Sequence, residues 1–290
     1  MEDRKTNKSS NQKSILITGC SSGIGLSVAE GLSRSGYRVF ATVRQRKDIE
    51  KLTQQGLESL QLDLDDSFSI QTALDEVLRR TGGNLYALFS NGGYGQPGAV
   101  EDLSRDAIRV QFETNLFGTM ELINRVIPVM RKQGFGRIIQ CSSILGFVAL
   151  PYRGAYIASK YALEGLTDTL RLELSKTPIR VSLIEPGPIT TLYKFNSLKF
   201  FKKYISAGTS PHSESYKYLE DRLSETDSIP SFALPPTAVL RKVMHALESE
   251  SPKIRYHVTF PTHLFAVLKR VLPDFLLDKI LLKASGGGRR

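Results

Sequence analysis

Tyr156 and Lys160 are the two residues of this sequence whose types and spacing most directly suggest acid–base chemistry. They stand four positions apart in YIASK, so on a helix their side chains share one face. An ammonium group beside a phenol favours the phenolate and lowers its pKa from roughly 10 toward neutrality. Such a tyrosine could exchange a proton with a carbonyl oxygen or an alcohol, which contributes roughly 10²- to 10⁴-fold in rate. The same spacing often marks a plain surface contact. Other motifs in the chain must therefore show whether this pair is catalytic.

A glycine-rich turn, TGCSSGIG at residues 18–25, lies between the first expected strand and the first expected helix. Glycines there let the backbone approach a pyrophosphate, while the helix N-terminus supplies N–H donors and a positive dipole end. A plain turn between strand and helix is the alternative, because three residues rather than one separate the first two glycines. The candidate phosphate-binding residues are Gly19, Ser21, Ser22, Gly23, Ile24 and Gly25.

Five motifs in this order resemble the main branch of the short-chain dehydrogenase/reductase family. They are residues 18–25 for its TGxxxGIG cofactor loop, Asn115 in TNLFG for its helix asparagine, Ser143 for its catalytic serine, Tyr156 and Lys160 for YxxxK, and Pro186, Gly187, Ile189 and Thr191 for its PGxxxT segment. The resemblance covers roughly residues 14–191 and the last strand. Within the family the sequence is most similar to retinol and 17β-hydroxysteroid dehydrogenases and to bacterial NADP-dependent aldehyde reductases of the YbbO type.

The resemblance implies a role for each catalytic residue. Lys160 would bind the nicotinamide ribose while depressing the pKa of Tyr156, which donates the proton in reduction. Ser143 would hydrogen-bond the substrate oxygen and stabilise the charge that develops there. Asn115 would hold a water between its helix and Lys160. The segment 186–191 would lie under the nicotinamide.

One departure from the family is visible after the fourth expected strand. The family has NNAG, whereas this chain has SNGG at residues 90–93. Asn91 and Gly92 are still expected to contact the cofactor, because both changes keep the loop small. We expect altered local stability rather than lost cofactor binding.

The end of the second expected strand indicates which cofactor is used. NAD-dependent enzymes usually place Asp or Glu there for the ribose hydroxyls. This chain instead has Arg44, followed by Arg46 and Lys47. Arginine can bind a 2′-phosphate with two hydrogen bonds, so NADP(H) is the predicted cofactor. Asp63, after the third strand, fits the family's adenine-contacting acid or, equally, a plain strand-end cap.

The elements that must position these residues alternate regularly along the chain. Apolar or β-branched runs at 14–18, 37–42, 57–62, 85–90, 137–142, 180–185 and 254–259 predict seven strands. Helical periods occur at 24–35, 67–80, 104–130 and 156–176. This pattern predicts an α/β fold, a Rossmann-like, doubly wound, parallel seven-stranded sheet with helices on both faces. Residues 14–262 would form this single domain, after a disordered tail at 1–13.

Composition excludes several classes of protein. The chain has 290 residues, 41% of them hydrophobic, which is enough for a core. Its two cysteines are too few for a disulfide framework, which favours a cytoplasmic setting, and its four histidines show no metal-ligand spacing. The formal charge is +10, but residues 14–191 carry only +1, so a nucleic-acid-binding body is not expected. No apolar run is long enough to span a bilayer.

Two segments break the regular alternation and bear on substrate and partners. Residues 192–236 form an aromatic, basic insertion. We expect it to cover the substrate, a small molecule with a carbonyl group and a bulky apolar part, with a plain packed helix as the alternative. Residues 263–290 form an amphipathic extension divided at Pro273, which would contact a membrane surface, close the substrate site or pack on another subunit. The sequence therefore predicts an NADP(H)-dependent oxidoreductase, most simply an aldehyde reductase. A hydroxysteroid or retinol dehydrogenase and a non-catalytic dinucleotide sensor are the alternatives, and the family resemblance implies a homo-oligomer.

Overall fold

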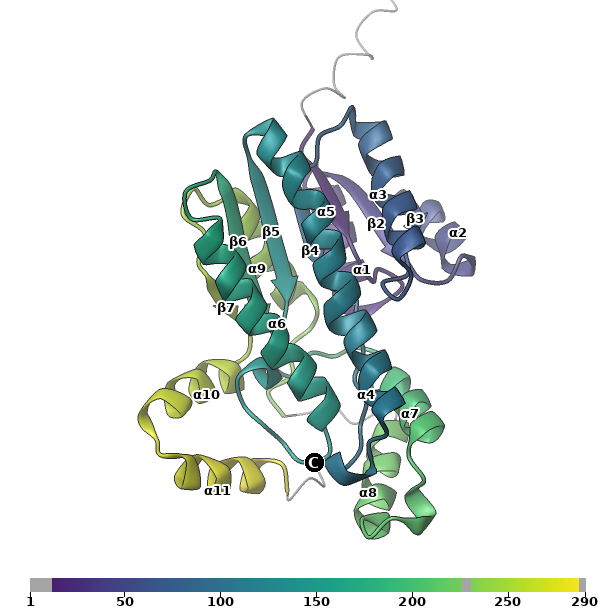
Figure 1. Cartoon of the computed structure of the whole chain (residues 1–290), viewed down its shortest axis with the longest axis vertical. Coiled ribbons are helices and arrows are strands. Elements are labelled where there is room, and N and C mark those ends of the chain that lie inside the picture. Colours follow the sequence, from purple (N-terminus) through teal and green to yellow (C-terminus); the bar gives the residue numbers. More distant parts are fainter. Residues whose placement is uncertain (1–11, 226–230, 287–290) are drawn as a thin grey trace, which may run out of the picture.

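The computed structural model describes residues 12–225 and 231–286, which are built around one parallel sheet of seven strands (Figure 1). The strand order is β3-β2-β1-β4-β5-β6-β7, and every neighbouring pair is parallel. The strands are β1 (Ser14–Ile17), β2 (Arg38–Val43), β3 (Glu58–Gln61), β4 (Ala87–Ser90), β5 (Gly136–Cys141), β6 (Ile179–Glu185) and β7 (Arg255–His257). The predicted fold class and all seven predicted strands are confirmed.

Helices cover both faces of the sheet, because its strands are apolar on both sides. The helices on one face are α1 (Gly23–Arg34), α2 (Lys47–Gln54) and α9 (Thr237–Glu248), and those on the other are α3 (Ser67–Thr81), α5 (Gly118–Gln133) and α6 (Gly154–Glu173) (Figure 1). Successive residues of β1 alternate between the two cores: Ile15 and Ile17 pack toward α1 and α9, and Leu16 packs toward α3 and α5.

The helix predicted at 104–130 is interrupted by a π-helical turn. The chain runs from α4 (Arg105–Phe112) through this turn, Glu113–Phe117, into α5 without leaving the helical region. Single π-helical turns of this kind are frequent at functional sites. The turn contains Asn115, which is fully buried.

The segments outside the regular alternation contain further helices. The insertion at 192–236 contains α7 (Tyr193–Tyr204) and α8 (Ser213–Ser224), and the C-terminal segment contains α10 (Phe260–Val271) and α11 (Asp274–Ala284), with Pro273 between them as predicted. Three short 3₁₀ helices complete the described set: Val100–Asp102, Ile144–Gly146 and Ala207–Thr209. Residues 226–230, most of the expected tail (1–11) and residues 287–290 lie outside the described residues.

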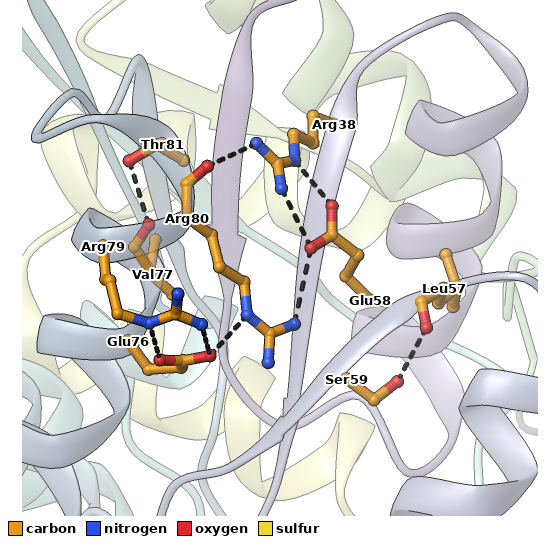
Figure 2. A network of polar contacts seen from close by, with 9 residues as sticks. All are labelled: Arg38, Leu57, Glu58, Ser59, Glu76, Val77, Arg79, Arg80 and Thr81. Atoms are coloured by element: carbon orange, nitrogen blue, oxygen red, sulfur yellow. Dashed lines mark hydrogen bonds and ion pairs between the residues drawn. The ribbon is translucent and has the colours of Figure 1, made fainter. Parts of the chain in front are cut away.

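A network of ion pairs fastens the β3 edge of the sheet to α3 (Figure 2). Glu58 on β3 pairs with Arg38 on β2 at 2.6 Å and with Arg80 on α3 at 3.4 Å, and Arg80 also pairs with Glu76 at 2.6 Å. These side chains are partly exposed, so each pair contributes only about 0–1 kcal/mol. Charged side chains on an edge strand such as β3 disfavour its pairing with a strand of another molecule.

We expect Gly118→Ala to lower the free energy of unfolding by about 1–3 kcal/mol, because an added Cβ would lie 1.7 Å from the Leu64 carbonyl oxygen. Gly165→Ala on α6 is the matched control, since an added Cβ there meets no atom within 4 Å. Removing that exposed helical glycine should raise stability by up to about 1 kcal/mol. Urea titration measures both changes, and equal midpoints for the two variants would contradict the packing described.

Candidate active site

The loops that follow β1 and β4 are joined at the carboxyl edge of the sheet. The hydroxyl oxygen of Thr18 accepts hydrogen bonds from the backbone N–H groups of Asn91, at 2.9 Å, and Gly92, at 2.8 Å. In return, the Asn91 side-chain amide donates to the Thr18 carbonyl oxygen at 3.0 Å. The chain leaves β1 toward one half of the sheet and β4 toward the other. This junction is therefore the switch point at which doubly wound sheets bind their ligands.

The glycines of the turn at 18–25 are required by close backbone contacts. Gly19 has a φ of +73°, and a Cβ at Gly25 would lie 2.2 Å from the Gly19 carbonyl oxygen. Helix α1 begins at Gly23, and its first turn carries no acidic residue, so the positive end of its dipole is uncompensated. The other predicted residues of the turn are not buried: Ser21, Ser22 and Ile24. The arrangement can accept an anionic group such as a diphosphate.

Ser90 and Gly92, the two positions where this chain departs from the family's NNAG, differ in how they pack against their neighbours. The Ser90 hydroxyl is buried and has no hydrogen-bond partner among the described residues. A Cβ at Gly92 would lie 3.0 Å from Leu64 Cδ1, so this position accepts a methyl group only if Leu64 shifts slightly. Both observations concern local packing, and the bonds to Thr18 are retained.

The segment at 186–191 meets the glycine-rich turn from another side. A Cβ at Gly23 would lie 3.2 Å from Thr191 Cγ2. The Pro186 carbonyl oxygen accepts the N–H of Ile144 at 2.8 Å, and Ile189 forms a parallel bridge to the segment that leads into α9. The segment thus links the glycine-rich turn to the loop that carries Ser143.

Basic side chains gather beyond the end of β2. Arg44, Arg46 and Lys47 are all exposed, and Lys47 begins α2. Asp63, after β3, accepts a hydrogen bond from the backbone N–H of Asp65 at 3.1 Å. This bond is the strand-end cap that the sequence allowed for Asp63. Its contact with an adenine ring stays a prediction.

Ser143 and Tyr193 lie beside the Tyr156 hydroxyl, and each of their hydroxyl groups lowers its pKa. Ser143 precedes the 3₁₀ helix Ile144–Gly146, and its Oγ accepts the N–H of Leu145 at 3.1 Å. Tyr156 lies in the first turn of α6, and its ring centre is 5.8 Å from that of Tyr193. Burial raises the pKa of Tyr156 to about 12, although the two hydroxyl contacts oppose that shift. At neutral pH Tyr156 is therefore a protonated donor.

The depression of the Tyr156 pKa by Lys160 stays a prediction, and burial of the phenol has the largest effect on that pKa in this structure. Its ammonium group lies 5.8 Å from the centre of the Tyr156 ring and donates to the Cys141 carbonyl oxygen at 2.8 Å. Lys160 is itself buried, and burial lowers its own pKa. The ammonium therefore faces the ring and a backbone carbonyl oxygen.

Asn115 joins the loop after β4 to α6. Its Nδ2 donates to the Tyr94 carbonyl oxygen at 3.0 Å and to Ser159 Oγ at 3.1 Å, and its Oδ1 accepts the N–H of Tyr94 at 3.1 Å. Ser159 in turn donates to the Tyr156 carbonyl oxygen at 2.7 Å. Both amide hydrogens of Asn115 are thus engaged in positioning the catalytic helix. The water between its helix and Lys160 stays a prediction.

Helix α7 begins beside Tyr156, and α7 and α8 lie next to each other at the end of the molecule below the sheet (Figure 1). The Tyr193 ring, at the start of α7, is 5.8 Å from that of Tyr156, and Phe200 stacks on Tyr94 at 3.7 Å. Behind them α7 and α8 share a small core of their own, which includes Phe201 and Tyr216. The aromatic residues of the insertion therefore form one wall of the site.

The C-terminal helices form a second apolar wall. Leu277 and Leu281 of α11 pack with Leu145 and Val148, in a cluster that Tyr156 also joins. Gly187 is held close to this part of the chain, since a Cβ there would lie 2.0 Å from Thr259 Oγ1. The surroundings of Tyr156 are consequently apolar on two sides.

The motif-based prediction missed three participants. Tyr193 was predicted only as one of many aromatic residues in the insertion, and its place directly after the 186–191 segment was the available signal. Ser159 and the Cys141 carbonyl oxygen gave no signal, because their roles depend on how α6 packs against the π-helical turn and β5.

The remaining reactive residue types have structural neighbours. Burial raises the pKa of the Cys20 thiol to about 12 and that of Cys141 to about 11, so neither is a thiolate at neutral pH. Each histidine has a side chain as neighbour: Glu101 for His212, Tyr256 for His245, Glu185 for His257 and His257 for His263. Within residues 12–225 and 231–286, no three acidic, histidine or cysteine side chains form a group suited to a metal ion. No helix in the same ranges is long and apolar enough to cross a membrane.

Comparison with known proteins adds four findings. The model of the short chain dehydrogenase family matches residues 13–198. The chain is 44% identical over 271 residues to the uncharacterized oxidoreductase YbbO of Escherichia coli K12, covering 93% of this chain and 94% of that protein. It is 33% identical to human 17-beta-hydroxysteroid dehydrogenase type 1, covering 90% and 80%. Among solved structures, a variant of actinorhodin polyketide ketoreductase with NADPH superposes with a TM-score of 0.69, at 25% identity, over 86% of this chain and 96% of that one.

Proposed function

The chain belongs to the short-chain dehydrogenase family, and from that premise and the geometry of its site we propose that it is an NADP(H)-dependent oxidoreductase that reduces bulky apolar carbonyl compounds, aldehydes first among them. The observation that carries the proposal is the contact between Ser143 and a protonated Tyr156, with Lys160 behind it. A hydroxyl that is protonated at neutral pH suits proton donation to a carbonyl oxygen.

The residues of the switch point fit a dinucleotide. The backbone approach between Gly19 and Gly25 leaves no room for a side chain, which is what a phosphate cradle requires. The uncompensated N-terminus of α1 suits a diphosphate, and Asn91, Gly92 and the 186–191 segment border the same turn. When bound, the cofactor supplies the hydride.

The chain's own groups perform the rest of the reaction. Ser143 and Tyr156 would both donate hydrogen bonds to the substrate carbonyl oxygen, stabilising the negative charge that develops there. Tyr156 would then transfer its proton to that oxygen. The buried ammonium of Lys160 stabilises the phenolate left behind and is placed to bind the ribose. Ser159 and Asn115 hold α6 so that Tyr156 stays in position.

Tyr156→Phe should lower the kcat for carbonyl reduction by roughly 10²- to 10⁴-fold, because the proton donor is lost while the ring remains. Reduction by the unchanged protein should show no loss from Tyr156 ionisation between about pH 6 and pH 9, whereas alcohol oxidation, which needs the phenolate, should rise with pH. Initial rates of NADPH consumption and NADP⁺ reduction measure these effects. The affinity of the Tyr156→Phe variant for NADPH, measured by fluorescence, should stay nearly equal to that of the unchanged protein. Retained turnover would refute the role of Tyr156.

The preference for NADP(H) is supported by the basic residues beyond β2. Arg44 is exposed at the end of that strand, and no acidic side chain precedes it on β2 to repel a 2′-phosphate. A guanidinium group can hold a phosphate with two parallel hydrogen bonds. The superposed ketoreductase is a structure with NADPH, which supports the same choice.

Arg44→Gln should raise the KM for NADPH by about tenfold or more while leaving that for NADH nearly unchanged, because the charge-assisted contacts reach only the 2′-phosphate. Arg34→Gln is the matched control, since Arg34 is an exposed arginine on α1 and its pair with Glu30 is a surface pair. Initial-rate kinetics with both cofactors decide the matter. An unmodified protein that uses NADH as efficiently as NADPH would overturn the assignment.

A hydroxysteroid or retinol dehydrogenase is the alternative function, favoured by the identity to human 17-beta-hydroxysteroid dehydrogenase type 1. A non-catalytic dinucleotide sensor is more remote, because such a protein has no chemical need for Ser143, Tyr156 and Lys160 together. We expect medium-chain aldehydes to give the highest kcat/KM in a matched panel with retinal and ketosteroids. A ketosteroid or retinal that is turned over faster would favour the alternative, and NADPH binding without turnover would favour the sensor.

A further inference from the structure

Helix α10 carries apolar side chains both on the side that packs on the domain and on an exposed side. Its inner face carries Phe265 and Leu268, which pack toward the loop after Ser143. Its outer face carries an apolar stripe at helical spacing, with these exposed fractions: Phe260 61%, Leu264 40%, Val267 57% and Val271 66%. Contiguous exposed apolar side chains of this kind mark sites of protein or membrane interaction.

The exposed surface continues beyond α10 in two directions. On α11 the outward residues include Phe275, at 62% exposed, and Leu282, at 50%. On the other side Phe232, at 64% exposed, lies with its ring 5.5 Å from that of Phe260. The backbone of Phe232 has a φ of +62°, which is costly for a bulky residue and occurs mostly at functional sites. The exposed apolar residues of the two C-terminal helices, here called the outer face, are Phe260, Leu264, Val267, Val271, Phe275, Leu276, Ile280 and Leu282.

The charges of the two helices favour an anionic partner. Lys279 and Lys283 are exposed among the apolar residues of α11, and Arg270 is exposed on α10. The fourth cation, Lys269, is also exposed, and its ammonium group donates to the Tyr161 hydroxyl at 3.1 Å. Two carboxylates, Asp274 and Asp278, leave a net positive charge.

A second copy of the chain would fit this face poorly. A two-fold interface places the same surface of both subunits in contact, so two surfaces of the same net positive charge would have to meet. An anionic bilayer meets both requirements together, because its headgroups pair with the lysines and its interior accepts Phe and Val side chains.

We propose that the outer face of α10 and α11 docks on an anionic lipid bilayer, with the two helices lying in the interfacial plane. The helices form a hairpin beside the sheet, at the lower left of Figure 1, so the rest of the chain can stay in water. Their inner faces pack against the cluster that includes Tyr156. Docking therefore brings the candidate active site to the membrane surface, where apolar substrates concentrate. The proposal is independent of the reaction proposed above.

The test is flotation of the full chain with vesicles of phosphatidylcholine containing about 30% phosphatidylglycerol. The unchanged protein should float, with less recovery at high salt and on vesicles of phosphatidylcholine alone. V267S/V271S removes two apolar side chains from the outer face without changing the charge and should weaken the partition coefficient about tenfold. K279Q/K283Q should weaken it to a similar extent and reduce its dependence on salt.

F68S/L172S is the matched control, because Phe68 and Leu172 are 78% and 62% exposed on α3 and α6, outside the outer face. It should bind as the unchanged protein does, and circular dichroism should show equal helix content in all variants. Equal recovery of V267S/V271S and unchanged protein would overturn the proposal. So would an absence of vesicle binding together with a dimer that V267S/V271S dissociates, since the occupant would then be a second copy.

Discussion

The junction between the loops after β1 and β4 is the constraint on which the other parts of the site depend. One hydroxyl, that of Thr18, accepts two backbone N–H groups, and Asn91 closes the contact from the opposite direction. The approach is so close that Gly19 and Gly25 admit no side chain. A parallel sheet brings the carboxyl ends of all its strands to one edge. This junction determines where that edge opens and therefore where the cofactor cradle, Ser143 and Tyr156 must meet.

The catalytic pair is governed by desolvation rather than by attraction between charges. Tyr156 lies between the insertion and the C-terminal helices, and the apolar surroundings hold its pKa at about 12. The ammonium of Lys160 is buried as well, and it is satisfied by the Cys141 carbonyl oxygen rather than by the phenol. The Tyr156 hydroxyl in such a site keeps its proton at neutral pH. That state suits the reductive half of the proposed reaction, because reduction takes a proton from Tyr156 and oxidation requires its removal first.

The two apolar walls of the site have different relations to solvent. The wall made by α7 and α8 is closed by its own core around Phe201 and Tyr216. The wall made by α10 and α11 uses only its inner face, and its outer face remains apolar and basic. This difference explains how the charge of +10 is distributed: the catalytic stretch is nearly neutral, and part of the excess lies on helices that could meet an anionic surface.

The sequence by itself determined the fold class, the seven strands and the order of the motifs, because hydrophobic periodicity and glycine placement are local properties of the chain. It also identified Asn115, Ser143, Tyr156 and Lys160 as candidates, since their spacing is readable without coordinates. Only the tertiary structure decided which atoms these residues contact: Asn115 binds Tyr94 and Ser159, Lys160 binds the Cys141 carbonyl oxygen, and Tyr193 reaches Tyr156. It alone decided the pKa of Tyr156 and which face of α10 is buried. Burial and hydrogen-bond partners arise from segments far apart in the chain, and no local pattern specifies how such segments pack.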